Sequence, residues 1–210
     1  MGVKISRPVT GRSQKRAART RALLQEAALN VFSERGIDAA TVEEITQRAD
    51  LGKGTLYRHF ADKYEIVIAL VEQTISRLIA QLRLYKGKAR TAEDVLEHLL
   101  DAHCRFFAEN SEEFILLSQG RALLKFERQT ASELEGPYSR YLEEIENQIT
   151  PYVSPRTDRA KARRFACAAA GFIFGFFSFA IIRMSPEEIE AGIKPLRQAF
   201  IKSLSVFLER

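Results

Sequence analysis

The most restrictive feature of this 210-residue chain is the spacing of its apolar residues, which recur every three or four positions in most segments. That spacing places them on one face of an α-helix, whereas a half-buried strand requires strict alternation. No stretch of the sequence shows sustained alternation, and the few Gly and Pro residues fall mostly between the periodic segments. We therefore predict an all-α fold, in which an N-terminal head of three helices precedes a larger C-terminal helical bundle.

Start and stop signals predict a group of helices in the first third of the chain. Thr41 and Glu44 have the spacing of a capping box, and Gly36 follows the last apolar turn of the first helix, where a glycine commonly ends a helix. The residues Asp50-Leu51-Gly52 form a predicted tight turn. The predicted helices are 13–35, 42–49, 53–60 and 62–84.

The remaining two thirds contain similar signals. Thr91 with Asp94 starts one helix, and Ser185, followed by Pro186 and two acids, starts the last one. Gly136-Pro137 is predicted to separate two helices. The predicted helices are 91–109, one from Ser111, one after Pro137 that ends near Thr150, 158–184, and one from Ser185 to the C-terminus.

The positive charge of the chain is concentrated near its N-terminus. Residues 1–63 contain twelve Lys and Arg against seven Asp and Glu, whereas residues 64–210 contain twenty of each. Residues 1–21 contain no acid, and we expect residues 1–12 to form a disordered basic arm. A localised basic excess suits a polyanion such as DNA, and a solvated tail is the alternative.

The two short helices between residues 41 and 60 are too small to form a core by themselves. They need the helix at 13–35 and the start of the helix at 62 to bury their apolar residues. The second short helix presents Lys53, Thr55 and His59, and the major groove of DNA is wide enough to admit a helix.

The sequence from Thr41 to Lys63 (TVEEITQRADLGKGTLYRHFADK) resembles the helix-turn-helix of the tetracycline-repressor (TetR) family. The resemblance covers residues 21–70, and its most specific part is Gly54-Thr55-Leu56-Tyr57 with His59-Phe60 and Lys63. Three residues depart from the pattern of the family: Thr46, Asp50 and Gly52. Gly52 offers no side chain to cap the second short helix.

The resemblance implies roles for seven residues of the head. The implied phosphate contacts are Thr41, Tyr57, His59 and Lys63. The implied contacts to base edges are Lys53 and Thr55, with Gly54 allowing close approach. These roles agree with the chemistry of the side chains, because Lys pairs well with guanine and a Thr methyl can meet the thymine methyl.

Residues 165–182 contain no charge and include Gly171 and Gly175 at the spacing of a close-packing motif. We interpret this segment as a buried helix shared by the core and a dimer interface, with a membrane span as the alternative. The last helix has apolar residues at the spacing of helix-on-helix packing. The resemblance implies that the last two helices of each subunit form the interface of a homodimer.

A set of aromatic residues could line an apolar cavity for a ligand, and the alternative is that they fill the core. The candidate ligand-binding residues are Phe106, Phe107, Phe126, Tyr138, Tyr141, Phe172 and Phe176. The resemblance implies a small-molecule effector that changes the spacing between the two heads of a dimer. The abundance of Phe and the absence of Trp favour an apolar or aromatic effector.

Other classes of function find little support in the sequence. His98, Asp101 and His103 do not share one helix face, so we expect neither a metal site nor a cofactor. No set of nucleophile, base and orienting residue is visible, so we do not expect an enzyme. Cys104 and Cys167 match no paired motif and are expected to be reduced and buried. No secretory signal is apparent, which favours the cytoplasm.

These observations predict a ligand-responsive regulator of transcription. Residues 1–12 would form the basic arm, residues 13–62 the helix-turn-helix domain, and residues 63–210 the ligand-binding and dimerisation domain. The protein would act as a repressor that an apolar or aromatic effector releases from a palindromic operator in double-stranded DNA. The alternatives are a DNA-binding regulator controlled by a protein partner and a membrane-associated helical protein.

Overall fold

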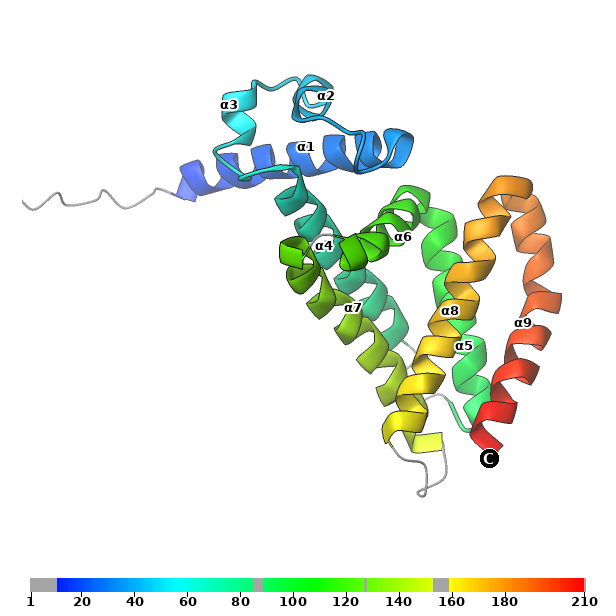
Figure 1. Ribbon diagram of the computed structural model, residues 1–210. Coiled ribbons are helices and arrows are strands. Elements are labelled where there is room, and N and C mark those ends of the chain that lie inside the picture. Colours follow the sequence, from blue (N-terminus) through cyan, green and yellow to red (C-terminus); the bar gives the residue numbers. More distant parts are fainter. Residues whose placement is uncertain (1–10, 85–88, 127, 153–158, 210) are drawn as a thin grey trace, which may run out of the picture. The chain divides into compact units, whose positions relative to one another are not determined.

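The computed structural model describes residues 11–84, 89–126, 128–152 and 159–209. The secondary structure of these residues is helical, and the predicted all-α fold is confirmed (Figure 1). The helices are α1 (Gly11–Arg35), α2 (Val42–Arg48), α3 (Lys53–Leu56), α4 (Lys63–Arg83), α5 (Ala92–Glu109), α6 (Ser111–Phe126), α7 (Arg128–Ile149), α8 (Arg159–Arg183) and α9 (Pro186–Glu209), with a short 3-10 helix at Thr150–Tyr152.

The chain forms two compact units, which divide between Leu70 and Val71, inside α4. The predicted boundary at residues 62 and 63 precedes this division and stays a prediction. Most of the predicted basic arm lies outside the described residues, and α1 begins at Gly11, slightly before the predicted start.

The first unit is built around α1, which buries one apolar stripe: Leu24, Ala27, Ala28, Val31 and Phe32. The other segments add buried side chains to this core: Ile45 of α2, Leu56 of α3, Phe60 of the following loop, and Ile66 and Val67 of α4. Helices as short as α2 and α3 are not stable in isolation. Their stability therefore comes from this shared core.

Local hydrogen bonds fix the ends of α2. The Thr41 hydroxyl accepts from the Glu44 N–H at 3.2 Å, and the Glu44 carboxylate accepts from the Thr41 N–H at 2.9 Å, which confirms the predicted capping box. At the other end, the Leu51 N–H donates to the Thr46 carbonyl and the Asp50 N–H donates to the Gln47 carbonyl. This pair of bonds is the Schellman motif, and it requires the positive φ of 53° at Asp50.

The structure corrects the predicted length of the second short helix. Regular α-helix covers Lys53–Leu56, and the predicted continuation to Phe60 is a series of turns. The Arg58 and His59 N–H groups donate to carbonyls three residues earlier rather than four. Gly52 begins α3 without a side-chain cap, and four residues leave little regular helix to resist this tighter winding.

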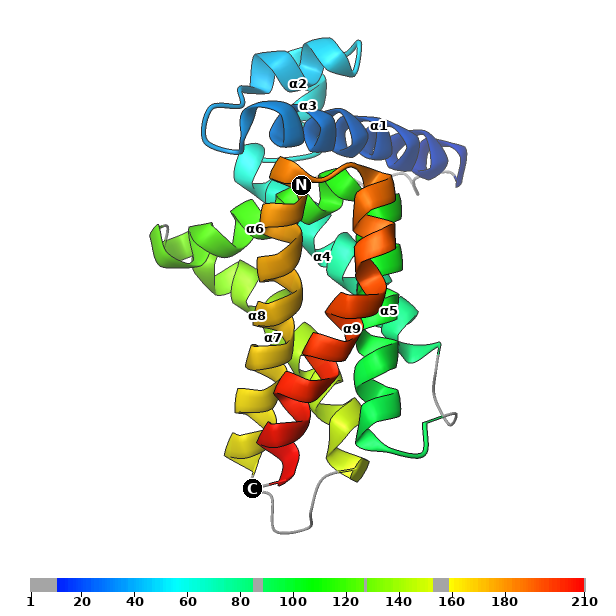
Figure 2. The ribbon, with the colours of Figure 1, turned by 90° about the vertical axis from the view of Figure 1, so that its right-hand side faces the viewer.

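In the second unit, α6 packs on α7, α7 on α8, and α9 on both α5 and α8 (Figure 2). Phe107 lies at the centre of an aromatic cluster. Its ring centroid is 4.9 to 5.8 Å from those of four neighbours: Phe106, Phe114, Phe174 and Phe177. Edge-to-face pairs of this kind stabilise beyond the burial of their area. The cluster joins α5, α6 and α8.

One buried polar pair lies beside this cluster. His103 Nδ1 is 2.5 Å from the Leu99 carbonyl, which fixes that nitrogen as the donor, and Nε2 accepts from the Tyr141 hydroxyl at 2.8 Å. Burial lowers the pKa of His103 from its ordinary 6.5 to about 4. His103 is therefore neutral near pH 7.

The prediction that Gly136-Pro137 separates two helices is wrong, because α7 continues through Pro137. A proline inside a helix costs about 3 kcal/mol relative to alanine. Here the apolar face of the same helix is buried at Leu134, Pro137, Tyr141 and Ile145. Packing of that face against the neighbouring helices offsets the cost of the proline.

Helix α8 buries one face and exposes another. The buried face includes Phe165, Ala169, Ile173 and Phe177, which accounts for much of its apolar character. The opposite face leaves Phe179 75% exposed. The segment Ala160–Ala180 is long and apolar enough to cross a membrane, a property that core helices also show.

Cys104 is buried as expected, but the same prediction for Cys167 is wrong. Cys167 follows Ala166, which is fully buried in the core, and adjacent residues of a helix point in different directions. Cys167 therefore lies on the exposed side of α8.

We expect alanine substitutions at two glycines of the second unit to change the free energy of unfolding in opposite directions. A Cβ at Gly120 would lie 3.0 Å from the Tyr138 hydroxyl, which is held by its hydrogen bond to the Leu117 carbonyl, whereas one at Gly136 would make ordinary contact. We expect Gly120→Ala to lower the free energy of unfolding by about 1 kcal/mol, as overpacking does. The matched Gly136→Ala should raise it by up to about 1 kcal/mol. Urea denaturation measures both, and equal effects would contradict the packing described.

Candidate nucleic-acid interface

The helix-turn-helix of the first unit presents most of the predicted contact residues to solvent. Thr41, Lys53, Gly54 and Tyr57 are exposed, and Thr55 and His59 are half-buried. Tyr57 is 56% exposed, which is unusual for a large aromatic side chain. Nothing lies within 4 Å of a Cβ placed on Gly54, so the surface there is open to a close approach.

The two predicted base-contacting side chains have partners within the first unit. The Lys53 ammonium is paired with the Glu43 carboxylate of α2. The Thr55 hydroxyl accepts a hydrogen bond of 3.0 Å from Arg58. Arg58 is exposed and belongs to the same surface, although its position in the sequence did not single it out.

Lys63 occupies a different environment from the other predicted phosphate contacts. Its ammonium donates to three carbonyl oxygens between α1 and α2, those of Ile37, Asp38 and Ala40, at 2.8 to 3.1 Å. An ammonium has three hydrogens to donate, and these contacts use all of them. Lys63 therefore holds the loop before α2 in place.

Arg21 of α1 supports the other end of the motif, and the sequence analysis did not identify this role. Its guanidinium donates to the His59 carbonyl at 2.7 Å and lies 4.0 Å above the ring of Phe60. The preceding turns of α1 carry exposed cations: Arg12, Lys15, Arg16 and Arg19. The excess of Lys and Arg in residues 1–21 had indicated that this part of the surface is basic.

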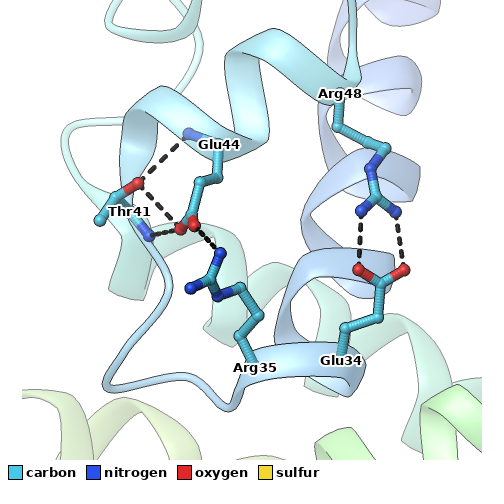
Figure 3. Close-up of polar contacts among 5 residues, drawn as sticks. All are labelled: Glu34, Arg35, Thr41, Glu44 and Arg48. Atoms are coloured by element: carbon cyan, nitrogen blue, oxygen red, sulfur yellow. Dashed lines mark hydrogen bonds and ion pairs between the residues drawn. The ribbon is translucent and has the colours of Figure 1, made fainter.

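Two ion pairs connect the C-terminal end of α1 to α2 (Figure 3). Arg35 pairs with Glu44, and Arg48 donates to both oxygens of Glu34 at 2.9 and 2.7 Å. Hydrogen bonds from the Thr41 N–H and hydroxyl lower the pKa of the Glu44 carboxyl below its ordinary value. Glu44 is therefore charged near neutral pH and serves both the capping box and the Arg35 pair.

The structure does not bring the candidate ligand-binding residues of the second unit to one place. Phe106, Phe107 and Tyr141 are buried near the aromatic cluster, and Tyr138 donates to the Leu117 carbonyl at 2.6 Å. Phe172 and Phe176 instead line a surface groove between α8 and α9. The side chain of Phe126 lies outside the described residues.

Among the described residues, no group of three His, Cys, Asp or Glu side chains comes together that could hold a metal ion. His98 and His103 have separate backbone partners, the carbonyls of Leu82 and Leu99.

Comparisons with known proteins agree with the geometry of the first unit. Residues 24–70 match the family described as bacterial regulatory proteins, tetR family. The uncharacterized HTH-type transcriptional regulator YvdT of Bacillus subtilis is 28% identical over 126 residues, which cover 59% of this chain and 63% of that protein. The HTH-type transcriptional regulator SAB2452 of Staphylococcus aureus is 26% identical over 113 residues, 54% of this chain and 61% of that protein. The chain thus spans less than two thirds of these curated relatives.

Solved structures share the fold over most of the chain. The transcriptional regulator FadR from Bacillus subtilis, in complex with stearoyl-CoA, superposes with a TM-score of 0.72 at 17% identity, over 86% of this chain and 97% of FadR. GusR of Salmonella enterica gives a TM-score of 0.73 at 19% identity, over 91% and 96% of the two chains. At such identities the likeness concerns the fold alone.

The all-α fold and the exposed turn between α2 and α3 define a helix-turn-helix protein. Residues 24–70 match the helix-turn-helix domain of the tetR family of bacterial regulatory proteins, in agreement with the resemblance of residues 21–70.

The Lys63 contacts predict a local effect on stability. Lys63→Met leaves three carbonyls without their donor and should cost about 1–3 kcal/mol. Hydrogen exchange should show faster opening of amides in the α1–α2 loop and α2. Lys53→Met removes an exposed ion pair and should change exchange there very little. Equal protection in Lys63→Met and the unaltered protein would contradict a structural role for Lys63.

Proposed function

We propose that the chain is a cytoplasmic regulator of transcription, of the repressor type, that binds operator DNA through its first unit. The observation that carries this proposal is the exposed face of α2, α3 and the turn that follows, within the segment that matches the tetR family. Residues there combine positive charge with hydrogen-bonding groups, as an interface with the DNA backbone and base edges requires.

The proposed contacts divide into two groups by chemistry. Tyr57, His59 and the backbone around Thr41 would contact phosphates and fix the register of the protein on the duplex. Lys53 and Thr55 would face base edges in the major groove, with Gly54 allowing the approach. Lys63 would act indirectly, by holding the loop that precedes Thr41.

A homodimer is the proposed active state, because two heads related by a two-fold axis can read two half-sites roughly 34 Å apart. The exposed face of α8 offers a surface for the second copy. Phe179, Phe172, Phe176 and Leu196 surround a groove with little polar surface, and the space above Gly171 and Gly175 is open. Exposed apolar patches of this kind mark interaction sites.

An apolar small molecule bound by the second unit is the proposed effector. The aromatic cluster around Phe107 is packed in this structure, so a ligand would have to separate its rings, and the buried His103–Tyr141 pair would supply the polar group of the site. FadR, which shares the fold, is described in complex with stearoyl-CoA, whose acyl chain is long and apolar, and this supports a ligand with an apolar part for the present chain. Binding would favour a conformation of lower affinity for DNA.

Two substitutions in the first unit test the proposal. Tyr57→Ala should weaken binding to a selected duplex and to random duplex by a similar factor, about tenfold, because a phosphate contact carries no sequence information. Thr55→Ala should lose about tenfold in discrimination at one base pair of each half-site. Fluorescence anisotropy at a stated salt concentration measures both affinities.

Ser76→Ala, a surface change in the second unit, is the control and should match the unaltered protein. The assignment of the two groups fails if Thr55→Ala, like Tyr57→Ala, weakens binding to the selected duplex and to random duplex by the same factor.

If the groove between α8 and α9 forms the dimer interface, a charge placed in it should halve the mass of the sedimenting species. Phe179→Glu places a charge in the groove and should convert a dimer into a monomer in sedimentation velocity at micromolar concentration. Leu84→Glu alters a side chain that is equally exposed, 74% against 75%, and should leave the dimer intact. A Phe179→Glu protein that remains dimeric would place the interface elsewhere.

A further inference from the structure

An acidic residue lies where the proposed function calls for contact with a polyanion. Glu43 occupies the first turn of α2, and its carboxylate pairs with the ammonium of Lys53, the first residue of α3. Both side chains remain largely in solvent, with 60% of Glu43 and 52% of Lys53 exposed. The pair therefore presents an acceptor and a donor together on the surface of the helix-turn-helix.

The capping of α2 does not explain why an acidic residue occupies position 43. The capping box uses Thr41 and Glu44, and Glu44 also forms the ion pair with Arg35. Glu43 adds negative charge near the positive end of α2, but an exposed helix-dipole contact is weak and is screened by salt. Against DNA, an unpaired carboxylate would instead repel the phosphates. A role for this carboxylate must therefore use its ability to accept hydrogen bonds.

A G·C base pair offers the complementary arrangement in the major groove. Guanine presents two acceptors, N7 and O6, and cytosine presents one donor, its N4 amino group. O6 and N4 are themselves hydrogen-bonded, so they lie about 2.9 Å apart. A paired ammonium and carboxylate have the same adjacency, with the ammonium suited to guanine and the carboxylate suited to cytosine.

We propose that Glu43 is a specificity-determining residue, and that Glu43 and Lys53 act as one unit that reads a single G·C pair in each half-site. This inference rests on the proposed function, since it assigns a base preference to the same surface. Lys53 alone could donate to any acceptor in the groove. With Lys53 facing the purine and Glu43 the pyrimidine, Glu43 requires a donor on the pyrimidine. Cytosine N4 supplies that donor, whereas in an A·T pair the only amino group, adenine N6, lies on the purine side and Glu43 would face the thymine O4 and methyl.

The same arrangement reduces binding to random sequence. Where no base donor faces Glu43, its charge cancels that of Lys53 and lowers the number of cations that contact phosphates. Removing the carboxylate should therefore strengthen non-specific binding while it weakens discrimination. A residue that merely stabilised α2 would weaken both kinds of binding.

The test compares full-length protein with Glu43→Met, Lys53→Met, the double variant and Glu72→Met, because Met removes the acceptor oxygens that Gln would keep. Glu72 forms a similarly exposed ion pair with Arg140 in the second unit and is the matched control. Each protein selects duplexes from one random pool, and anisotropy then measures affinity for the selected duplex, for its G·C-to-A·T variants at each position, and for random duplex.

The unaltered protein and Glu72→Met should prefer G·C at one position of each half-site. Glu43→Met should lose about tenfold of the discrimination at that position alone. It should bind random duplex about two- to fivefold more tightly. The double variant should lose no more discrimination there than either single variant, because the two side chains act together.

Two results would overturn the inference by different routes. If the unaltered protein binds its selected duplex and Glu43→Met retains the same preference at every position, Glu43 has no part in specificity and the proposed function stands. If the unaltered protein is folded and binds no duplex, the proposed function fails and the inference fails with it.

Discussion

The contact between the apolar stripe of α1 and the two short helices is the interaction on which the first unit depends. Seven residues of α2 and four of α3 cannot sustain helical structure by themselves. Burial of Ile45 and Leu56 supplies the stability that the short helices lack. The side chains on the polar surface of the motif are not needed for this core, so Tyr57 can remain exposed.

Interactions between near neighbours in the chain could be predicted from the sequence. The capping boxes at Thr41 and Thr91 and the glycine stop at Gly36 each involve residues within a turn of one another, and the structure contains all three. Periodicity predicted α1, α4 and α5 within a few residues, because their apolar stripes are long. Asp50 adopts the positive φ that glycine usually adopts in such a turn, so the turn forms without a glycine at this position.

Interactions between distant segments could not be read in this way. The contacts of Lys63 with the α1–α2 loop and the pairing of Lys53 with Glu43 depend on how the helices pack, which side-chain type alone does not determine. Pro137 was misread because tertiary burial outweighs helix propensity. The candidate ligand residues are all aromatic, yet Phe107 lies in the core and Phe176 lines a surface groove. Aromatic residues occur in both environments, so residue type alone could not tell them apart.

The central claim is that two copies of the first unit read a symmetric site in DNA. The most direct test is to sequence the duplexes that the purified full-length chain enriches from a random pool at a stated salt concentration. The account predicts an inverted repeat whose half-sites have centres about 10 base pairs, or one helical turn, apart. A single unsymmetric half-site, or no enrichment by protein that circular dichroism shows to be folded, would contradict it.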